Sequence, residues 1–183
     1  TGVENAIKSA LSESNTSSDD VDVLIIGTTH FVNALVQRTK LAQTGVIRMC
    51  LPSGSSILPF ADWPNSLISG MKGAYKLIKG GYEMTGGEIS QLDHNELISA
   101  ARELRDIGCN QIAISSVFAT VRGDMEQEAL EILTKEMPDL SITLSKSIGG
   151  MGLLERENAA IINASLRPLA AEVIDSFKLL QKS

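Results

Sequence analysis

Aromatic residues and cysteines are both scarce in this chain of 183 residues. Tryptophan, tyrosine and phenylalanine make up 4% of the sequence, so the core has to be built mainly from aliphatic side chains. The two cysteines, Cys50 and Cys109, are too few for a disulfide framework in a chain of this length. We expect two buried thiols in a reducing compartment, the cytoplasm, with a disulfide between them as the alternative.

Basic charge is also in short supply. The chain has 16 lysines and arginines against 22 aspartates and glutamates, which gives a formal net charge of −6. A nucleic-acid-binding surface needs clustered basic residues to neutralise phosphates, and an anionic membrane surface attracts the same residues. No apolar run approaches the roughly 18 residues of a membrane-spanning helix. The composition therefore argues against both nucleic acid and membrane as partners.

The sequence does contain an alternation of helix-like and strand-like segments. Apolar residues at helical spacing predict a helix over residues 3–11, and the β-branched run 21–26 predicts a strand buried on both faces. A short helix is expected over 31–38 and a second strand over 45–50. This alternation is typical of an α/β fold with a mainly parallel sheet and flanking helices, and the length suits a single domain over 1–183.

Residues 51–92 interrupt the alternation. Three prolines break regular structure in the first half of this segment, and two glycine pairs, 80–81 and 86–87, follow in the second half. We interpret the segment as an irregular insertion. Within it, short strands at 75–78 and 87–90 are expected to flank a glycine-rich turn.

Regular structure returns after the insertion. Asp93 and Glu96 have the spacing of a capping box, and Gly108 is a natural helix stop. Pro168 lies within the last helical pattern and is expected to kink or split that helix. The expected elements are helices at 93–108 and 124–135, strands at 111–118 and 140–144, and a long helix after residue 150.

The best candidate for a ligand site is the segment Gly27-Thr28-Thr29-His30, with Asn33 close behind it. It follows a predicted strand and opens a helix. Ligands of open α/β sheets bind beyond the carboxyl ends of the strands, and the free N–H groups of a helix start suit a phosphate or carboxylate. The alternative is that Thr28 or Thr29 merely caps the helix. His30 is a candidate base, but no nucleophile can be assigned to it.

A second glycine-rich turn, 149–152, precedes the long helix. It is neither a P-loop nor a dinucleotide-binding fingerprint, because no Lys-Ser/Thr follows the glycines and the GxGxxG spacing is missing. Glu157 could point toward the strand ends while Arg156 pairs with an acid. The alternative is an ordinary charged first turn favoured by the helix dipole. His94 falls in a first helical turn, and no metal site is predicted.

Five segments of the sequence, which follow one another in the order expected for the family, resemble the N-terminal region of the hydantoinase/oxoprolinase family. The resemblance spans nearly the whole chain and is greatest to hydantoin-utilisation A-type proteins, with His30-Phe31 as a variant of the threonine motif. The segments are GTTHFVNALVQR (27–38), LPFADWP (58–64), GGYEMTGGEISQLD (80–93), AISSVFATV (113–121) and GLLERENAAIINASLRPL (152–169).

The resemblance implies part of an actin/hexokinase-like ATPase fold and an ATP-dependent hydrolase of cyclic amides such as hydantoins or 5-oxoproline. ATP, with Mg, would phosphorylate the amide oxygen and make it a leaving group. The nucleotide/substrate cleft would be lined by Gly27, Thr28, Thr29, His30 and Asn33. The supporting positions would be Arg38, Arg156, Glu157 and Asn163. No catalytic residue is assigned.

The sequence departs from the family pattern in two respects. Members normally begin with a β-hairpin that carries an aspartate and a glycine-rich phosphate loop, which would precede Thr1, and the rest of the ATP site and the metal-bearing region would follow Ser183. In addition, Gln37 stands where an acid is frequent. We therefore expect this chain to be a fragment of a larger intracellular enzyme that does not turn over substrate by itself.

Two alternatives share the same fold. One is a non-catalytic binding or assembly module, and the other is an ATPase of the small-molecule kinase kind. In each case, apolar faces left exposed on a fragment would favour self-association into a homo-oligomer or docking on a partner subunit of the same enzyme.

Overall fold

The computed structural model describes residues 2–23 and 29–180. In these ranges the chain forms a four-stranded sheet of order β2-β1-β3-β4, and each neighbouring pair of strands is parallel. The strands are β1 (Thr44–Leu51), β2 (Ala74–Lys79), β3 (Gln111–Ser116) and β4 (Ser141–Leu144). The helices are α1 (Gly2–Ser14), α2 (His30–Gln37), α3 (Asn65–Met71), α4 (His94–Asp106), α5 (Asp124–Glu136) and α6 (Leu153–Leu180), with short 3-10 turns at Ser18–Asp20 and Ser145–Ser147.

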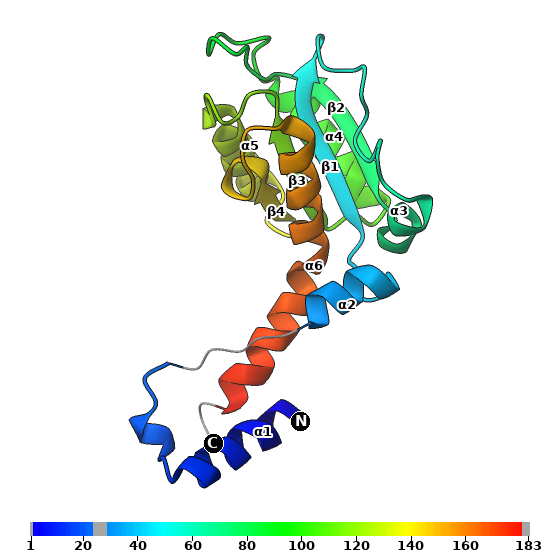
Figure 1. Ribbon diagram of the computed structural model, residues 1–183. Helices are drawn as coiled ribbons and strands as arrows, with labels where there is room; N and C mark the ends of the chain where they lie inside the picture. The colour runs from blue at the N-terminus through cyan, green and yellow to red at the C-terminus, as the bar shows by residue number, and fades with distance from the viewer. Residues whose placement is uncertain (1, 24–28, 181–183) are drawn as a thin grey trace.

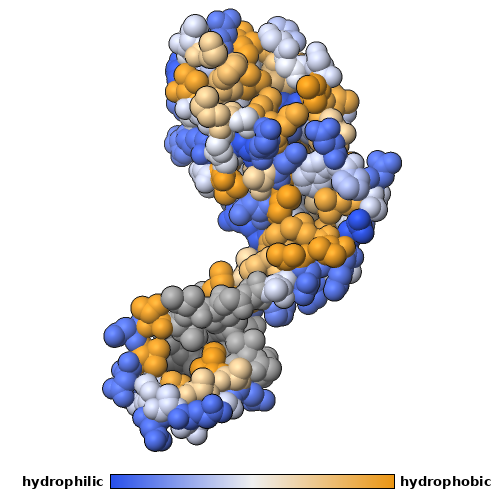
Figure 2. All heavy atoms as spheres, viewed as in Figure 1, coloured by the Kyte–Doolittle hydropathy of each residue, from blue (hydrophilic) through white to orange (hydrophobic). Residues whose placement is uncertain are grey.

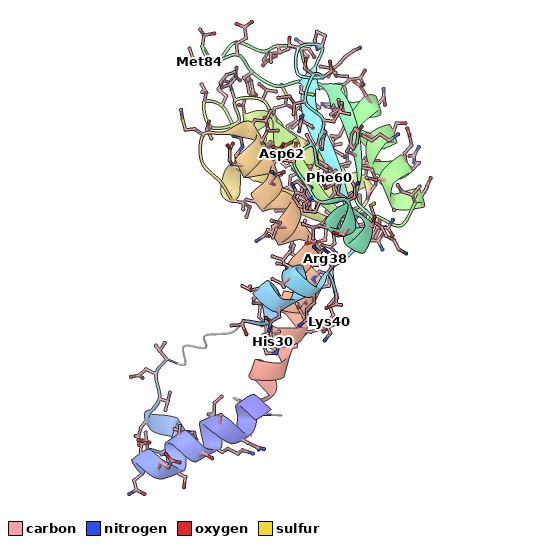
Figure 3. The ribbon with its side chains drawn as sticks, turned by 45° about the vertical axis from the view of Figure 1, so that its right-hand side comes forward. His30, Arg38, Lys40, Phe60, Asp62 and Met84 are labelled. Atoms are coloured by element: carbon pink, nitrogen blue, oxygen red, sulfur yellow. The ribbon has the colours of Figure 1, made fainter. Side chains whose placement is uncertain are left out.

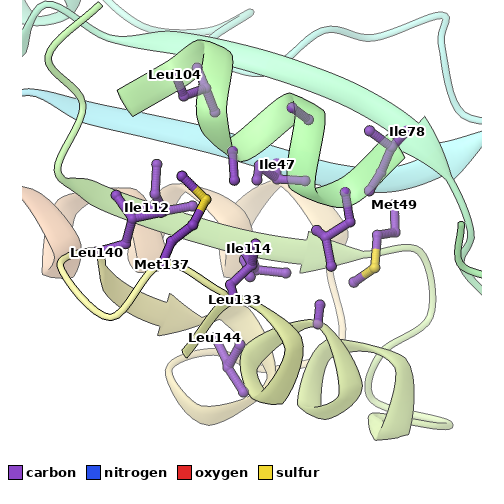
Figure 4. Close-up of a cluster of buried hydrophobic side chains, with 14 of the residues drawn as sticks. Ile47, Met49, Ile78, Leu104, Ile112, Ile114, Leu133, Met137, Leu140 and Leu144 are labelled. Carbon is purple, nitrogen blue, oxygen red and sulfur yellow. The ribbon is translucent and has the colours of Figure 1, made fainter. Parts of the chain in front are cut away.

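The sheet is covered on both faces. Ile47 of β1 and Ile114 of β3 point into a cluster with Leu104 of α4 and Leu133 of α5, and all four are fully buried (Figure 4). On the other face, Val46 and its neighbours pack against α6 and the segment that contains α3. Side chains alternate between the two faces of a strand, so two covered faces explain why the predicted strands are continuous apolar runs.

A narrow neck joins this three-layered core to the N-terminal helix. Helix α6 begins at the sheet and extends well beyond it, α2 lies against its projecting part, and α1 lies at the far end (Figure 1). The link from α2 to β1 is tied to α6 by a hydrogen bond from the Ala42 N–H to the Ser165 carbonyl, at 2.9 Å. This neck, formed by α2 and the part of α6 that faces it, therefore carries His30 and Asn33, which belong to the predicted ligand site.

The N-cap at Asp93 and the helix stop at Gly108, both predicted from the sequence, are confirmed. The Asp93 carboxylate caps α4 by accepting hydrogen bonds from the backbone N–H groups of Asn95 and Glu96. Gly108 follows the helix with a φ of +97°, which favours glycine. The Glu96 side chain does not complete the capping box, because it accepts a hydrogen bond from the Lys79 N–H.

The strand predicted at 21–26 is not part of the sheet in the described residues. Residues 21–23 have no strand structure, and Val23 exposes 73% of its surface. Residues 24–26 lie outside the described residues. Of the predicted strand–helix–strand unit, the described residues contain the helix, α2, and the second strand, β1.

The segment 51–92 contains more regular structure than its prolines and glycines suggested. The strand expected at 75–78 forms as part of β2, but it pairs parallel with β1 at the edge of the sheet. The second strand, expected at 87–90, does not form, and an isolated antiparallel bridge joins Tyr82 and Glu88 instead. The glycines do serve turn geometry, since Gly81 and Gly86 have φ values of +91° and +85°.

Helix α6 is continuous through Pro168 and is not split there. Cys50 and Cys109 are fully buried free thiols, and burial raises the pKa of both, which keeps them protonated. The disulfide alternative is therefore wrong.

No helix in the described part of the chain is long and apolar enough to cross a membrane.

Candidate functional site

The carboxyl ends of the parallel strands meet the start of α6 in a buried polar cluster. Arg48 comes from β1, Ser115 and Ser116 from the end of β3, and Ser145 follows β4. Arg156 and Glu157 project into this edge from the first turns of α6. Because all the strands are parallel, their carboxyl ends lie at one edge of the sheet, which is where such folds bind ligands.

The first half of the cluster is a buried ion pair between Arg48 and Glu157. The guanidinium donates from Nε to Glu157 Oε2 at 2.7 Å and from Nη2 to Oε1 at 2.5 Å, and the two side chains expose 1% and 0% of their surfaces. Ser115 Oγ donates to Oε2 at 2.5 Å, and Arg48 Nη1 donates to the Ile57 carbonyl. This bidentate geometry compensates for part of the cost of burying both charges.

The second half links Arg156 to Glu126 of α5 through Ser145. Arg156 Nε donates to Ser145 Oγ at 2.9 Å, and Ser145 Oγ donates to Glu126 Oε1 at 2.7 Å. The carboxylate also accepts from the backbone N–H groups of Ser116 and Lys146, at 2.9 and 3.0 Å. Burial raises the pKa of Glu126 and lowers that of Arg156, while these hydrogen bonds oppose the rise at Glu126.

Arg156 also fixes the glycine-rich turn that precedes α6. Its Nη1 lies within 3.4 Å of the carbonyl oxygens of Gly150, Met151 and Gly152, and its Nη2 donates to the Ser116 carbonyl at 2.7 Å. The acid that the sequence expected near Arg156 is Glu126, and Ser145 bridges the two. Both carboxylates of the cluster are occupied by donors, so the cluster holds the edge of the sheet together rather than offering free ligands.

Sequence reasoning missed Arg48 and Glu126. A signal for Arg48 was present, because a single charge stands inside the apolar run of a strand that is covered on both faces. Glu126 gave no such signal, since acidic residues are common in the first turn of an exposed helix. Only the fold reveals that this turn of α5 faces the end of β3.

The predicted site at the start of α2 forms a separate region. Thr29 occupies the N-cap position of α2 but makes no side-chain capping bond, and its Oγ1 accepts instead from Asn33 Nδ2 at 3.3 Å. The capping alternative is therefore wrong for the Thr29 side chain. Gly27 and Thr28 lie outside the described residues.

His30 and Asn33 line a pocket of about 220 Å³ between α2 and α6. Figure 3 shows His30 and Lys40 at the neck, on the same part of the molecule. The other lining residues are Ala34, Gln37, Thr39, Lys40 and Leu169.

The structure does not bring the two groups of predicted residues together. Leu169, which lines the pocket, is twelve residues beyond Glu157 in one continuous helix, a rise of about 18 Å. Asn163 lies between them on α6 and is exposed, and Arg38 ends α2 in the left-handed conformation with an exposed side chain. The predicted site is thus divided between the sheet edge and the neck.

Metal ligation has little support among the residues that the structure describes. These residues contain no cluster of three or more histidine, cysteine, aspartate or glutamate side chains placed to hold an ion. His94 begins α4, and its Nε2 lies 2.8 Å from Glu128 Oε1 on α5, so it links two surface helices.

The chain matches the family described as "Hydantoinase/oxoprolinase N-terminal region" over residues 1–137. No curated protein matches it. Solved structures with a similar fold include two ATP-dependent enzymes. The ATP-dependent caprolactamase from Pseudomonas jessenii is 20% identical, with a TM-score of 0.75 over 98% of this chain and 28% of that chain. Acetone carboxylase, in a nucleotide-free structure, is 16% identical, with a TM-score of 0.67 over 93% of this chain and 28% of that chain.

Identities this low show the fold alone, and the fold is the expected α/β one, a parallel sheet with flanking helices. The chain spans just over a quarter of the length of each of these enzymes.

Proposed function

We propose that this chain, which belongs to the hydantoinase/oxoprolinase family, forms the N-terminal part of an ATP-dependent hydrolase of cyclic amides. The observation that carries the proposal is the family match over residues 1–137, three quarters of the chain. The caprolactamase agrees with it in fold and is itself described as ATP-dependent. Caprolactam is a cyclic amide, as are hydantoin and 5-oxoproline, which we propose as substrates of the same kind.

The residues described in the structure do not by themselves fit Mg-ATP. Mg²⁺ requires accessible oxygen ligands, whereas the carboxylates of Glu126 and Glu157 are fully buried and each already accepts three hydrogen bonds from the protein. The pocket at the neck, at about 220 Å³, is smaller than the sites that enclose ligands of nucleotide size. We therefore derive no step of the reaction through ATP and propose that the remainder of a longer enzyme binds it.

Within this proposal, the neck contributes to the substrate cleft. Gly27, Thr28, Thr29, His30 and Asn33 are its proposed lining residues. The buried cluster supports the cleft indirectly, because Arg156 and Glu157 fix the start of α6, and α6 carries the far wall of the pocket at the neck. Arg38 and Asn163 stay proposed supporting positions. The two buried free thiols agree with our proposal of a cytoplasmic enzyme.

The experiment is an ATPase assay on the protein encoded by the complete reading frame that contains this chain. We expect hydantoin, 5-oxoproline or caprolactam to stimulate phosphate release, and we expect the isolated 183-residue chain to show no turnover. ATP hydrolysis that responds to none of these rings, but to a phosphate-accepting alcohol, would favour the kinase-like alternative.

A second candidate is an ATP-dependent carboxylase, and the acetone carboxylase structure favours it. The same assay separates the two candidates. A carboxylase should respond to a ketone with bicarbonate and should be indifferent to cyclic amides, whereas the hydrolase should behave in the opposite way.

A further inference from the structure

Strand β2 forms one edge of the sheet (Figure 1). Among the described residues its strand partner is β1 alone, and the N–H of Gly80, just after β2, donates to the last carbonyl of β1. The N–H of Lys79 points the other way and donates to the Glu96 carboxylate of α4 at 3.3 Å. Because backbone N–H groups alternate in direction along a strand, those of Tyr75 and Leu77 also point away from β1.

The outward groups of Tyr75 and Leu77 have no backbone partner in the part of the chain that the structure describes. Each residue of a parallel strand presents its N–H and its C=O on the same side, so these two residues offer two donors and two acceptors in a row. Glu96 closes this row at Lys79. A strand edge of this kind pairs with an extended segment of another chain through main-chain hydrogen bonds.

An apolar groove of about 570 Å³ lies beside the edge. The residues that line it are 56–61, Ile68, Gly73 and Tyr75, and none of them is charged. Tyr75 pairs with Val46 of β1 and therefore projects on the face of the sheet that α3 and α6 cover. Ile57, Leu58 and Tyr75 expose 52%, 43% and 38% of their surfaces. Apolar side chains at every second position of an added strand would pack against these three residues.

Two exposed lysines stand at the ends of β2. Lys79 is its last residue, and Lys72 lies two residues before its start. Neither side chain forms an ion pair with a described residue, whereas Lys76, on the face toward α4, is paired with Glu103. Lysines on a sheet edge discourage indiscriminate pairing, so the same two residues select for a partner with acidic ends.

We propose that the outer edge of β2 binds an extended segment of a partner protein that has apolar side chains at alternate positions and an acidic residue at each end. Main-chain hydrogen bonds join the segment to Tyr75 and Leu77, its apolar side chains enter the groove, and its acidic residues pair with Lys72 and Lys79. A second copy of this chain fits the edge less well, because β2 (AYKLIK) contains two lysines and no acid. The inference adds a partner to the proposed function and does not depend on it.

The test is an NMR titration of the 183-residue chain with the end-capped peptide Glu-Thr-Val-Thr-Val-Thr-Glu. In an extended conformation the glutamates and valines of this peptide share one face, and the threonines occupy the other. The backbone N–H signals of Tyr75 and Leu77 should shift. Exchange of these two hydrogens with solvent should slow, because both gain a hydrogen-bond acceptor.

Two N-methylated versions of the peptide test the main-chain pairing. Alternate N–H groups of an added strand face β2, so either the valines or the threonines donate to the edge, but not both. Methylation of the donating set should raise the Kd roughly tenfold, the loss expected for the hydrogen bonds to the Tyr75 and Leu77 carbonyls. Methylation of the other set should leave the Kd nearly unchanged.

Leu77→Pro tests the same pairing from the side of the protein. The proline removes an N–H that does not bond to β1, and an edge strand tolerates proline at such a position. Leu77→Ala is the matched control, since it removes the leucine side chain and keeps the N–H. The proline variant should bind the peptide about fivefold more weakly than the alanine variant.

The role of the lysines is tested by changing the charge on each side. Lys79→Gln should raise the Kd of the acidic peptide about threefold. The peptide Lys-Thr-Val-Thr-Val-Thr-Lys should bind more weakly than the acidic one. Lys135→Gln is the control and should leave the Kd unchanged, because Lys135 is an exposed lysine of α5 that has no ion pair with a described residue.

The inference would be overturned if the acidic peptide does not bind, if the two methylated peptides bind equally, or if the basic peptide binds as tightly as the acidic one. Shifts of the Tyr75 and Leu77 signals that follow protein concentration without any peptide would assign the edge to a second copy of the chain. That result would overturn the inference as well.

Discussion

Arg48 lies inside strand β1 with its guanidinium bonded to Glu157, and neither side chain reaches solvent. Arg48→Met should therefore lower the free energy of unfolding by about 3–5 kcal/mol, because it leaves a buried carboxylate without its partner. Urea unfolding measures the loss. The double variant Arg48→Met/Glu157→Leu should lose less than the single variant, since it removes both charges. Strictly additive losses would show that the pair is not coupled in the fold.

A matched control uses an ion pair on the surface. Lys76 on β2 forms an ion pair with Glu103 on α4. Like Arg48 and Glu157, these residues join a strand to a helix, but their side chains expose 38% and 55% of their surfaces. Lys76→Met should leave the urea midpoint nearly unchanged, because solvent screens such pairs.

Glu126 makes stability depend on pH in a predictable direction. Burial raises its pKa in the folded state above the ordinary 4.5, so the folded protein prefers the protonated carboxyl more than the unfolded chain does. The contribution of this group is thus fully present below pH 4.5 and is lost as the pH rises through the raised pKa. Relative to Glu126→Gln, the wild-type chain should lose stability between pH 4.5 and neutrality.

Denaturation of both proteins across this pH range measures the difference. Glu131→Gln, an exposed substitution on the same helix, is the control and should show no such trend. A difference between wild type and Glu126→Gln that stays constant with pH, or that grows in favour of the wild type, would contradict the assignment.

At the level of elements, apolar runs and capping signals predicted most of the core. The runs at 45–50 and 111–118 became β1 and β3, because strands covered on both faces need apolar side chains on both. The run at 21–26 has the same character, yet residues 21–23 are exposed. Periodicity registers hydrophobicity but not whether another layer of the protein is present to cover it.

The candidate site was less predictable than the fold. Arg156 and Glu157 could be placed at the strand ends from the glycine turn before α6. Their respective partners, Glu126 and Arg48, are 30 and 109 residues away in sequence. Pairings of this range depend on the order of the strands, which residue patterns alone do not give. The pocket at the neck likewise needs the contact between α2 and α6.

The connection from β2 to α4 depends on one glycine in particular. Gly81 has a φ of +91°, and a Cβ there would lie 2.8 Å from the Met49 carbonyl oxygen. Gly81→Ala should lower the free energy of unfolding by about 2 kcal/mol or more, from left-handed strain together with this clash. Thermal or urea unfolding measures the loss.

Gly150→Ala provides the comparison for this prediction. A Cβ at Gly150 meets no atom within 4 Å, so its effect should stay within about 0.5 kcal/mol. Equal effects at the two positions would mean that the path of the chain at residue 81 is not the one described.

At the scale of the whole molecule, the neck exposes apolar side chains to solvent. Figure 2 shows apolar surface at the level of α2 between the core and α1, and Val32 and Val36 are among the exposed large apolar side chains. We expect the chain to self-associate as its concentration rises, because association would remove this apolar surface from water. Analytical ultracentrifugation of Val32→Ser/Val36→Ser should show weaker association than the wild type.

Met84→Ser is the control for this experiment. Met84 is 75% exposed and lies in the glycine-rich turn on the side of the core that is far from His30 (Figure 3). A monomeric wild-type chain at high concentration, or equal association of the two variants, would argue against an interface at α2.

We propose that the protein containing this chain opens cyclic amides with hydrolysis of ATP. The most direct measurement is the amount of ring-opened product per ATP hydrolysed by the protein encoded by the complete reading frame, with 5-oxoproline as the first substrate. We expect ring-opened product that requires ATP and accumulates in proportion to the phosphate released. Phosphate release without ring opening of 5-oxoproline, hydantoin or caprolactam would contradict it.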